Sequence, residues 1–436
     1  MKRHAILWGS LLCVILLAGL IWPVAAAPKK VTLTLWCHQL VLHKNGFERV
    51  AKVFTEKHPN ITIKVQPQAD IATQMKAALA AKSAPDMFTP RAEDMLELVL
   101  GRAIEPFPAD VLSVEELKAK HWPEYYLQSP FDKVYAVGIP DPIGDAGLVV
   151  NVDFLKEAGL AIPEEFESLD QMLDYAKKLT KTDASGKLIR AGLSCREYNN
   201  SVFAWDFIAE QGGKFYDNAT GKFDFTIPES RKAIEFFYDL HYKYKVDSVD
   251  LPDSYDAVSQ KVAAMAFMWA EYIPFAKTIY PDLNFAFVVK PSFVKGRQPI
   301  FTHVDTWNLA VWAGSKHKAE ALEFIKFLKT KEAQMLFLEE NPGISPLREL
   351  AKPEYYKNPE RSFLMPLLKH LPNMRFWGPF GNDSMIKDSF YRTMDAIEHK
   401  SLGLDEGLAK MTKDANEAVA RFRDRYPNAP KPKLQW

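Results

Sequence analysis

Hydrophobic positions in the first third of the chain follow two alternating periods. Residues 31–36 and 61–65 carry apolar side chains at every second position, which is the period of a strand. Residues 47–58 and 71–79 show the three- and four-residue spacing of a helix, and a short apolar stretch follows at 87–88. Strands and helices that alternate through short loops predict a mostly parallel sheet with helices on both faces.

The middle of the chain repeats this alternation after an interruption. Residues 140–147 contain two prolines and two glycines that break all periodicity, and we interpret them as a crossing between two lobes. Beyond this crossing we expect a hairpin at 214–225, a buried strand at 264–269 and an alternating strand at 285–289. Pro- and Gly-containing residues 291–299 would return the chain to the first lobe.

Residues 301–346 form a self-contained pattern of one strand and two helices. The strand is predicted at 307–312, and Thr330 is placed to cap the second helix, which ends before the turn Gly343–Pro346. The sequence of this segment resembles that of the extracellular solute-binding proteins of ABC importers, the family that includes maltose-binding protein. The matching positions are Leu309–Val311, Ser315–Lys316, Glu320–Leu322, Phe324–Ile325, Phe327–Leu328, Glu332, Gln334, Gly343 and Pro346.

A second run resembles the same family around the predicted crossing. It consists of Tyr135, Ile139–Pro140, Gly147, Asn151, Asp153–Phe154 and Ala158–Gly159. Family members usually carry a Tyr before the Asn, whereas this chain has Val150, so a ligand contact from that ring is absent.

The resemblance implies a two-lobed α/β fold, each lobe a mostly parallel sheet flanked by helices, with discontinuous lobes joined by a hinge. The first lobe would comprise residues 28–140 and 300–348, and the second 141–299 and 349–436, including helices expected at 385–399 and 404–423. It also implies that a monomer captures a sugar or related polyol in the interlobe cleft and delivers it to ABC permease subunits in the membrane, without catalysing a reaction.

Residues 1–27 have the layout of a secretory signal peptide. Basic residues precede an apolar run at 5–20, and Ala25–Ala27 end it as a processing site would, although cleavage after Ala26 competes with cleavage after Ala27. We therefore expect a periplasmic protein. The alternative is an uncleaved anchor, because the apolar run approaches the thickness of a bilayer.

Composition adds little to this picture but excludes some partners. Lys plus Arg equals Asp plus Glu at 55 each, so no global field favours nucleic acid or an anionic membrane. Cys37 and Cys195 remain after the signal, and a disulfide between them would lock two lobes that must move. We expect two separate, largely buried thiols.

Ligands of open parallel sheets bind beyond the carboxyl ends of the strands, and tryptophans cluster in or beside those loops. The five candidates are Trp36, Trp205, Trp269, Trp307 and Trp377. An indole ring stacks on the aliphatic face of a sugar, but any single Trp can equally be a core residue. By its resemblance to a family Trp that follows Ala264–Met265, Trp269 is the ring most strongly expected to stack.

Polar candidates in the same loops would hydrogen-bond the hydroxyl groups of a sugar. They are Glu93, Asp145, Asn200, Glu271, Asp305 and Arg375, with Arg91 and Asp94 nearby. Relatives place a polar contact at the position of Glu93, after Pro85–Asp86, while Asp86 itself is interpreted as structural. The pair Asp305 and Trp307 replaces a small, Gly-rich stretch of relatives and would narrow the cleft.

Other ligands and activities have weaker support. Arg91 and Arg375 would suit an anion or phosphorylated polyol and the carboxylates a polyamine, but neither sign dominates. His303 and Asp305 form only half of a metal site, so no metal is expected. A secreted carbohydrate-active enzyme would need a carboxylate pair such as Glu93 with Asp145, whose separation the sequence does not fix. Nucleophile-elbow, P-loop and dinucleotide motifs are absent, so we expect neither catalysis nor a cofactor.

Overall fold

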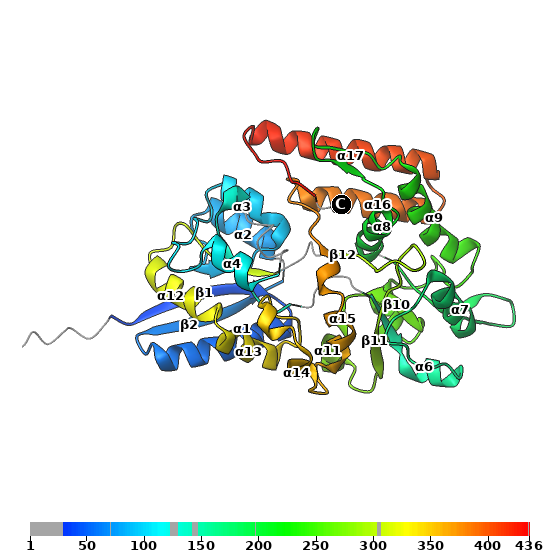
Figure 1. The fold of residues 1–436 in the computed structure, drawn as a ribbon, viewed down its shortest axis with the longest axis horizontal. Helices are drawn as coiled ribbons and strands as arrows, with labels where there is room; N and C mark the ends of the chain where they lie inside the picture. Colours follow the sequence, from blue (N-terminus) through cyan, green and yellow to red (C-terminus); the bar gives the residue numbers. More distant parts are fainter. Residues whose placement is uncertain are drawn as a thin grey trace, which may run out of the picture.

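Two β-sheets, each flanked by helices, organise the chain (Figure 1). The computed structural model describes residues 29–436 except 70, 123–129, 142–146, 197, 303–306 and 435. The predicted α/β fold class is confirmed. The predicted signal peptide lies outside the described residues, and within them no helix has the length and apolar character needed to cross a membrane.

The first sheet has the strand order β2-β1-β3-β13-β4. Its strands are β1 (Val31–His38), β2 (Ile61–Gln68), β3 (Met87–Phe88), β4 (Ala136–Gly138) and β13 (Asn308–Val311). β1 is parallel to β2 and β3, as predicted, and β13 pairs antiparallel with both β3 and β4. The late segment therefore completes a sheet that the N-terminal part begins.

Helices of the first lobe, which we define as the part built on this sheet, come from the same two stretches of sequence. They are α1 (Val41–Lys57), α2 (Ile71–Ala80), α3 (Met95–Leu100), α4 (Val114–Lys120), α12 (Lys318–Leu328) and α13 (Lys331–Glu340). Thr330 caps α13 as predicted, because its hydroxyl accepts a hydrogen bond from the Ala333 N–H at 3.2 Å. Asp86 is structural as expected, since its carboxylate accepts from the Thr34 N–H and the Ser315 hydroxyl.

The second sheet has the order β10-β5-β11, with strands β5 (Gly147–Asn151), β10 (Met265–Met268) and β11 (Phe285–Val289). The prediction of mostly parallel pairing is wrong here, because β5 runs antiparallel to both neighbours. Apolar periodicity identifies a buried strand but carries no record of its direction. Gly147 is required where β5 meets β11, since a Cβ at this position would lie 2.3 Å from the Val288 carbonyl oxygen.

The second lobe, built on this sheet, is mostly helical around it. Its helices are α6 (Val152–Glu157), α7 (Leu169–Leu179), α8 (Tyr198–Glu210), α9 (Pro228–Tyr242), α10 (Ser254–Ser259), α11 (Tyr272–Ile279), α14 (Pro353–Tyr356), α15 (Met365–Leu368), α16 (Asp383–Glu398) and α17 (Leu404–Arg425). Three two-stranded pairs join β6 (Lys181–Thr182) with β7 (Leu188–Arg190), β8 (Tyr216–Asp217) with β9 (Lys222–Phe223), and β12 (Phe301–Thr302) with β14 (Met374–Arg375).

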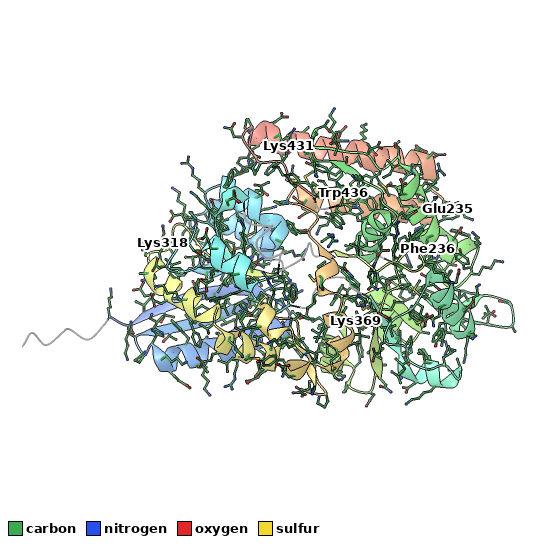
Figure 2. The ribbon with its side chains drawn as sticks, in the orientation of Figure 1. Glu235, Phe236, Lys318, Lys369, Lys431 and Trp436 are labelled. Atoms are coloured by element: carbon green, nitrogen blue, oxygen red, sulfur yellow. The ribbon has the colours of Figure 1, made fainter. Side chains whose placement is uncertain are left out.

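The C-terminal helices lie on the second lobe, as expected. α16 and α17 pack together and cover α8 and α9, and their apolar residues share one buried cluster with those helices (Figure 1). The terminal Trp436 extends this layer, with its ring 5.1 Å from that of Phe215 and 5.4 Å from that of Trp377 (Figure 2).

Buried residues divide into separate cores that follow the two sheets. One cluster combines residues 31–139 with 307–337, and two others combine 148–301 with residues from 344 onward. Phe301 packs with the second-lobe residue Met374, although the predicted first lobe begins at residue 300. The exact lobe boundaries stay a prediction. The thiols of Cys37 and Cys195 are buried in different cores and are not joined in a disulfide, as predicted, and burial raises the pKa of Cys37 to about 12.

Candidate functional site

Aromatic and basic side chains meet at the carboxyl ends of β1 and β3. β1 ends at His38, whose ring stacks on the Trp307 indole with centroids 4.7 Å apart. Arg91 follows β3 and forms a β-bridge with Trp307, and its guanidinium carbon lies 5.1 Å from the centre of that indole. These neighbours leave Trp307 only 8% exposed. Burial, with the nearby His43 and Arg91, lowers the pKa of His38 to about 3.

Trp36 lies on the same edge of the first sheet and is more accessible. Its side chain is half-buried, and its indole Nε1 donates to the Gln66 Oε1 on β2 at 3.3 Å. In register it stands beside Phe88, the last residue of β3. A partly exposed indole fixed by a neighbouring amide is a suitable platform for an apolar face of a ligand.

Glu93 reaches across to the second lobe. It lies in the short 3₁₀ helix η1 (Ala92–Asp94), and its side chain is 5% exposed. Its carboxylate pairs with Lys387 of α16, accepts from the Ser384 hydroxyl at 3.2 Å, and lies 3.4 Å from the Arg91 Nη1. The carboxylate predicted to bind a ligand is therefore engaged by protein groups in this structure.

Three buried ionisable side chains converge between the lobes. His43 comes from α1, Asp141 follows β4, and Glu271 follows β10. The His43 Nε2 lies 3.5 Å from the Asp141 Oδ1 and 3.7 Å from the Glu271 Oε1. The Trp307 N–H donates to the Asp141 Oδ2 at 3.2 Å, which joins this trio to the aromatic edge. Burial, reinforced by the charge of Asp141, raises the pKa of Glu271 well above its usual range.

Two predicted tryptophans belong to the core. Trp205 and Trp377 are 2% and 1% exposed, and both pack on Phe215 within the second lobe. Trp205 also meets Phe390 of α16 edge-on at 5.8 Å, so a C-terminal helix contributes to its burial. Their positions give no geometric support to the predicted ligand contact.

The remaining predicted residues are placed as follows. Trp269 is half-buried at the end of β10, with its ring 4.4 Å from that of Tyr255. The Arg375 side chain folds back onto the neighbouring backbone, and its Nη1 donates to the carbonyl oxygen of Met374 at 2.8 Å. Asp145 and Asp305, and the side chain of Asn200, lie outside the described residues.

The structure thus brings Trp36, Glu93, Glu271 and Trp307 to one region and excludes Trp205 and Trp377 from it. Sequence reasoning missed His38, His43 and Asp141. A signal for His43 was present, because it continues the helical spacing of Phe47 and Val50 toward the N-terminus and therefore had to lie on the buried face of α1.

The sequence profile described as bacterial extracellular solute-binding protein matches residues 42–335. The chain belongs to this family. Among relatives of this solute-binding protein, an uncharacterised ABC transporter extracellular-binding protein of Pyrococcus horikoshii is 25% identical over 337 residues, covering 74% of this chain and 73% of that one. The melibiose/raffinose/stachyose-binding protein of Bacillus subtilis is 23% identical over 360 residues, covering 75% and 77%.

Solved structures share the fold of this solute-binding protein over most of its length. A Thermotoga lettingae solute-binding protein bound to tagatose has a TM-score of 0.72 at 20% identity, covering 89% of this chain and 99% of that one. A Listeria monocytogenes substrate-binding protein in complex with cycloalternan has a TM-score of 0.74 at 17% identity, covering 90% and 100%. At these identities the similarity concerns the fold alone.

Proposed function

We propose that this solute-binding protein captures a neutral sugar or related polyol between its lobes and delivers it to the membrane permease of an ABC importer. The observation that carries the proposal is the half-buried Trp36 indole, held by Gln66 at the sheet edge where Arg91 also lies. A sugar needs both an aromatic surface for its apolar face and polar groups for its hydroxyls, and this edge supplies both.

Charge at this edge favours a neutral ligand over the charged solutes that remained open from the sequence. Glu93 is paired with Lys387, and Arg91 lies against both Glu93 and Trp307. Binding an ion here would require breaking these internal pairs. The sugars named for the Bacillus relative and present in the solved neighbours are consistent with the same class of ligand.

In this proposal the protein acts by motion and performs no chemistry on the solute. Trp36 and Arg91 belong to the first lobe and Trp269 to the second, so a ligand that contacts both favours a closed arrangement of the lobes. The closed, monomeric protein then docks on the permease outside the cytoplasm, after removal of the signal peptide at residues 1–27.

Calorimetric titration of the mature protein against maltotriose, mannobiose, raffinose and tagatose, with spermidine and sugar phosphates as charged comparators, tests this function. We expect at least one neutral sugar to bind and to be recovered intact. Trp36→Ala or Trp269→Ala should cost roughly 1–3 kcal/mol of affinity, about 5- to 150-fold, with little loss of folding stability.

Trp205→Ala is the matched control, because the same ring is removed from the core. It should cost roughly 3–5 kcal/mol of folding stability, while the fraction that stays folded binds with unchanged affinity. Binding of charged comparators alone, or cleavage of the sugar, would contradict the proposal. Large destabilisation by Trp36→Ala with unaltered affinity would show that the Trp36 ring does not contact the ligand.

A further inference from the structure

The trio His43, Asp141 and Glu271 has the composition and spacing of a metal-ligand set. One imidazole nitrogen and two carboxylate oxygens lie within 4.8 Å of one another, and in the part of the chain that the structure describes this is the one such group. The three side chains are 0%, 6% and 7% exposed. Because the three residues come from segments far apart in the sequence, no short spacing motif predicts that they form a metal site.

Hydrogen bonding leaves His43 and one oxygen of Glu271 unsatisfied. The distances of 3.5 Å and 3.7 Å from the His43 Nε2 to the two carboxylates exceed the 2.7–3.2 Å of an ordinary N–H···O bond. Among the described residues, neither ring nitrogen of His43 has a hydrogen-bond partner, nor does the Glu271 Oε1. Buried polar atoms are normally paired, so the His43 Nε2 and the Glu271 Oε1, which lie 3.7 Å apart, point to a partner that sits between the side chains.

Both geometry and charge match a divalent ion. Four ligands bound to zinc at about 2.0–2.1 Å in a tetrahedron stand about 3.3–3.4 Å apart, so the two separations from the His43 Nε2 need to close by a few tenths of an ångström. The two carboxylates offer oxygens within 4.8 Å of each other. Once Glu271 has lost its proton to the solvent, the two carboxylates carry a charge of −2, which one divalent cation compensates while the imidazole stays neutral. A proton on His43 would compensate only half of it.

Surrounding groups already hold the ligands in place. The Trp307 N–H fixes the Asp141 Oδ2, and the Asp141 backbone forms a β-bridge with Ile344. The rings of Trp307 and Phe337 lie edge-on to the His43 imidazole at 5.8 Å and 6.5 Å. The hydrogen bond to Asp141 is an outer contact of the kind that orients the ligands of metal sites, and the two rings limit the space around the imidazole.

We propose that His43, Asp141 and Glu271 bind one divalent transition-metal ion, with zinc the best match to the ligand set, where the two lobes meet. Three protein ligands leave one coordination position for water. His43 and Asp141 extend from first-lobe elements and Glu271 from the end of the second-lobe strand β10, so the ion joins the two lobes beside the proposed ligand edge. This departs from the sequence-based expectation of no metal.

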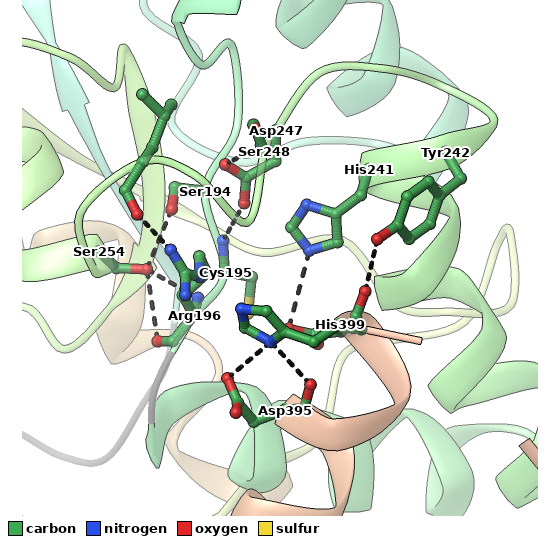
Figure 3. A network of polar contacts seen from close by, with 12 residues as sticks. Ser194, Cys195, Arg196, His241, Tyr242, Asp247, Ser248, Ser254, Asp395 and His399 are labelled. Carbon is green, nitrogen blue, oxygen red and sulfur yellow. Dashed lines mark hydrogen bonds and ion pairs between the residues drawn. The ribbon is translucent and has the colours of Figure 1, made fainter. Parts of the chain in front are cut away.

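A second buried histidine supplies the matched control. His241 lies 3.7 Å from Glu398, much as His43 lies from Glu271. There, however, the neighbouring carboxylate of Asp247 accepts hydrogen bonds from the Cys195 and Ser248 N–H groups (Figure 3). Both oxygens of Asp247 are thus engaged by backbone groups, and His241, Glu398 and Asp247 do not bring three ligand atoms within 4.8 Å of one another, so we expect no metal binding at His241.

The test uses zinc chloride alone, titrated by calorimetry into the mature protein after chelator treatment and without sugar. We expect one zinc ion per chain and a higher melting temperature with zinc. Glu271→Gln and Asp141→Asn, which keep side-chain size, should each weaken zinc binding at least tenfold. Glu398→Gln should leave it unchanged.

Circular dichroism establishes that each variant is folded, and if Glu271→Gln is not, Asp141→Asn decides. Cobalt(II) in the wild-type protein gives a result independent of any variant, since the proposed site should produce the visible absorption of a low-coordinate cobalt ion. No zinc binding, wild-type affinity in the folded carboxamide variants, or a cobalt spectrum like that of the aqueous ion would overturn the proposal. Sugar titrations of the metal-free protein keep this outcome separate from the proposed function.

Discussion

Glu93→Ala is expected to weaken ligand binding far more than it weakens folding. Glu93 of the first lobe pairs with Lys387 of the second, and their side chains are 5% and 3% exposed. When the lobes separate, water can reach both charges. The pair therefore stabilises mainly the arrangement in which the lobes touch, and this is the arrangement that the proposed mechanism couples to ligand.

The magnitude follows from what the substitution leaves behind. Removing one partner of a buried ion pair costs roughly 3–5 kcal/mol, because the remaining charge keeps its desolvation penalty without its counter-ion. Asp383 moderates the cost. Burial, together with the charge of Glu93, raises the pKa of its carboxyl to about 7, so without Glu93 it ionises more readily and partly compensates Lys387. We expect about 3 kcal/mol, or about 150-fold in affinity.

Calorimetric titration with the tightest-binding sugar and thermal unfolding of the ligand-free protein separate the two effects. Glu93→Ala, Lys387→Met and the double variant form a cycle that should show strong coupling in affinity and weak coupling in melting temperature. Glu97→Ala is the control. The Glu97–Arg425 ion pair also joins the lobes, at 3.2 Å, but its side chains are 33% and 68% exposed. Removing it should therefore cost only about 0–1 kcal/mol of binding free energy.

An unchanged affinity in Glu93→Ala together with a large drop in melting temperature would refute this reasoning. It would mean that the Glu93–Lys387 pair persists in every folded state and serves stability alone. Equal losses in Glu93→Ala and Glu97→Ala would refute the argument from burial.

Two further predictions concern stability. The buried Glu210 carboxylate lies 2.7 Å from the Lys290 Nζ and accepts hydrogen bonds from the Phe293 and Ile300 N–H groups. Glu210→Gln places an amide N–H against one of these donors and should lower the free energy of unfolding, measured in urea, by roughly 2–4 kcal/mol. The same substitution at the exposed Glu235 (Figure 2) should be neutral, and equal effects of the two substitutions would contradict the prediction. Burial lowers the pKa of His121 to about 4 from 6.5, so between these pH values only the unfolded state takes up a proton on this side chain. The contribution of the neutral His121 to the free energy of unfolding is therefore fully present above pH 6.5 and is lost as the pH falls toward 4. Between pH 7.5 and 4.5 the wild type should lose about 2.5 kcal/mol more than His121→Leu in urea unfolding, and parallel pH profiles would disprove this.

Local patterns in the sequence determined most elements of this protein. The alternation at 31–36 and 61–65 became β1 and β2, Thr330 caps α13, and the hairpin forms at 216–223. Such features depend on residues a few positions apart, whose spacing fixes which side of an element is apolar and where it ends. The residues that segment 301–346 shares with the solute-binding family likewise identified the class of protein, although they do not show which side chains contact a ligand.

Contacts between distant segments were decided only by the tertiary structure. Trp205 and Trp377 follow the same loop-end pattern as Trp36, yet they are buried because α16 and its neighbours pack over them. β5 runs against its neighbours, and His43, Asp141 and Glu271 converge from three segments. A sequence pattern records how apolar a position is, but burial and pairing depend on which element covers that position, and that choice is made by packing of the whole chain.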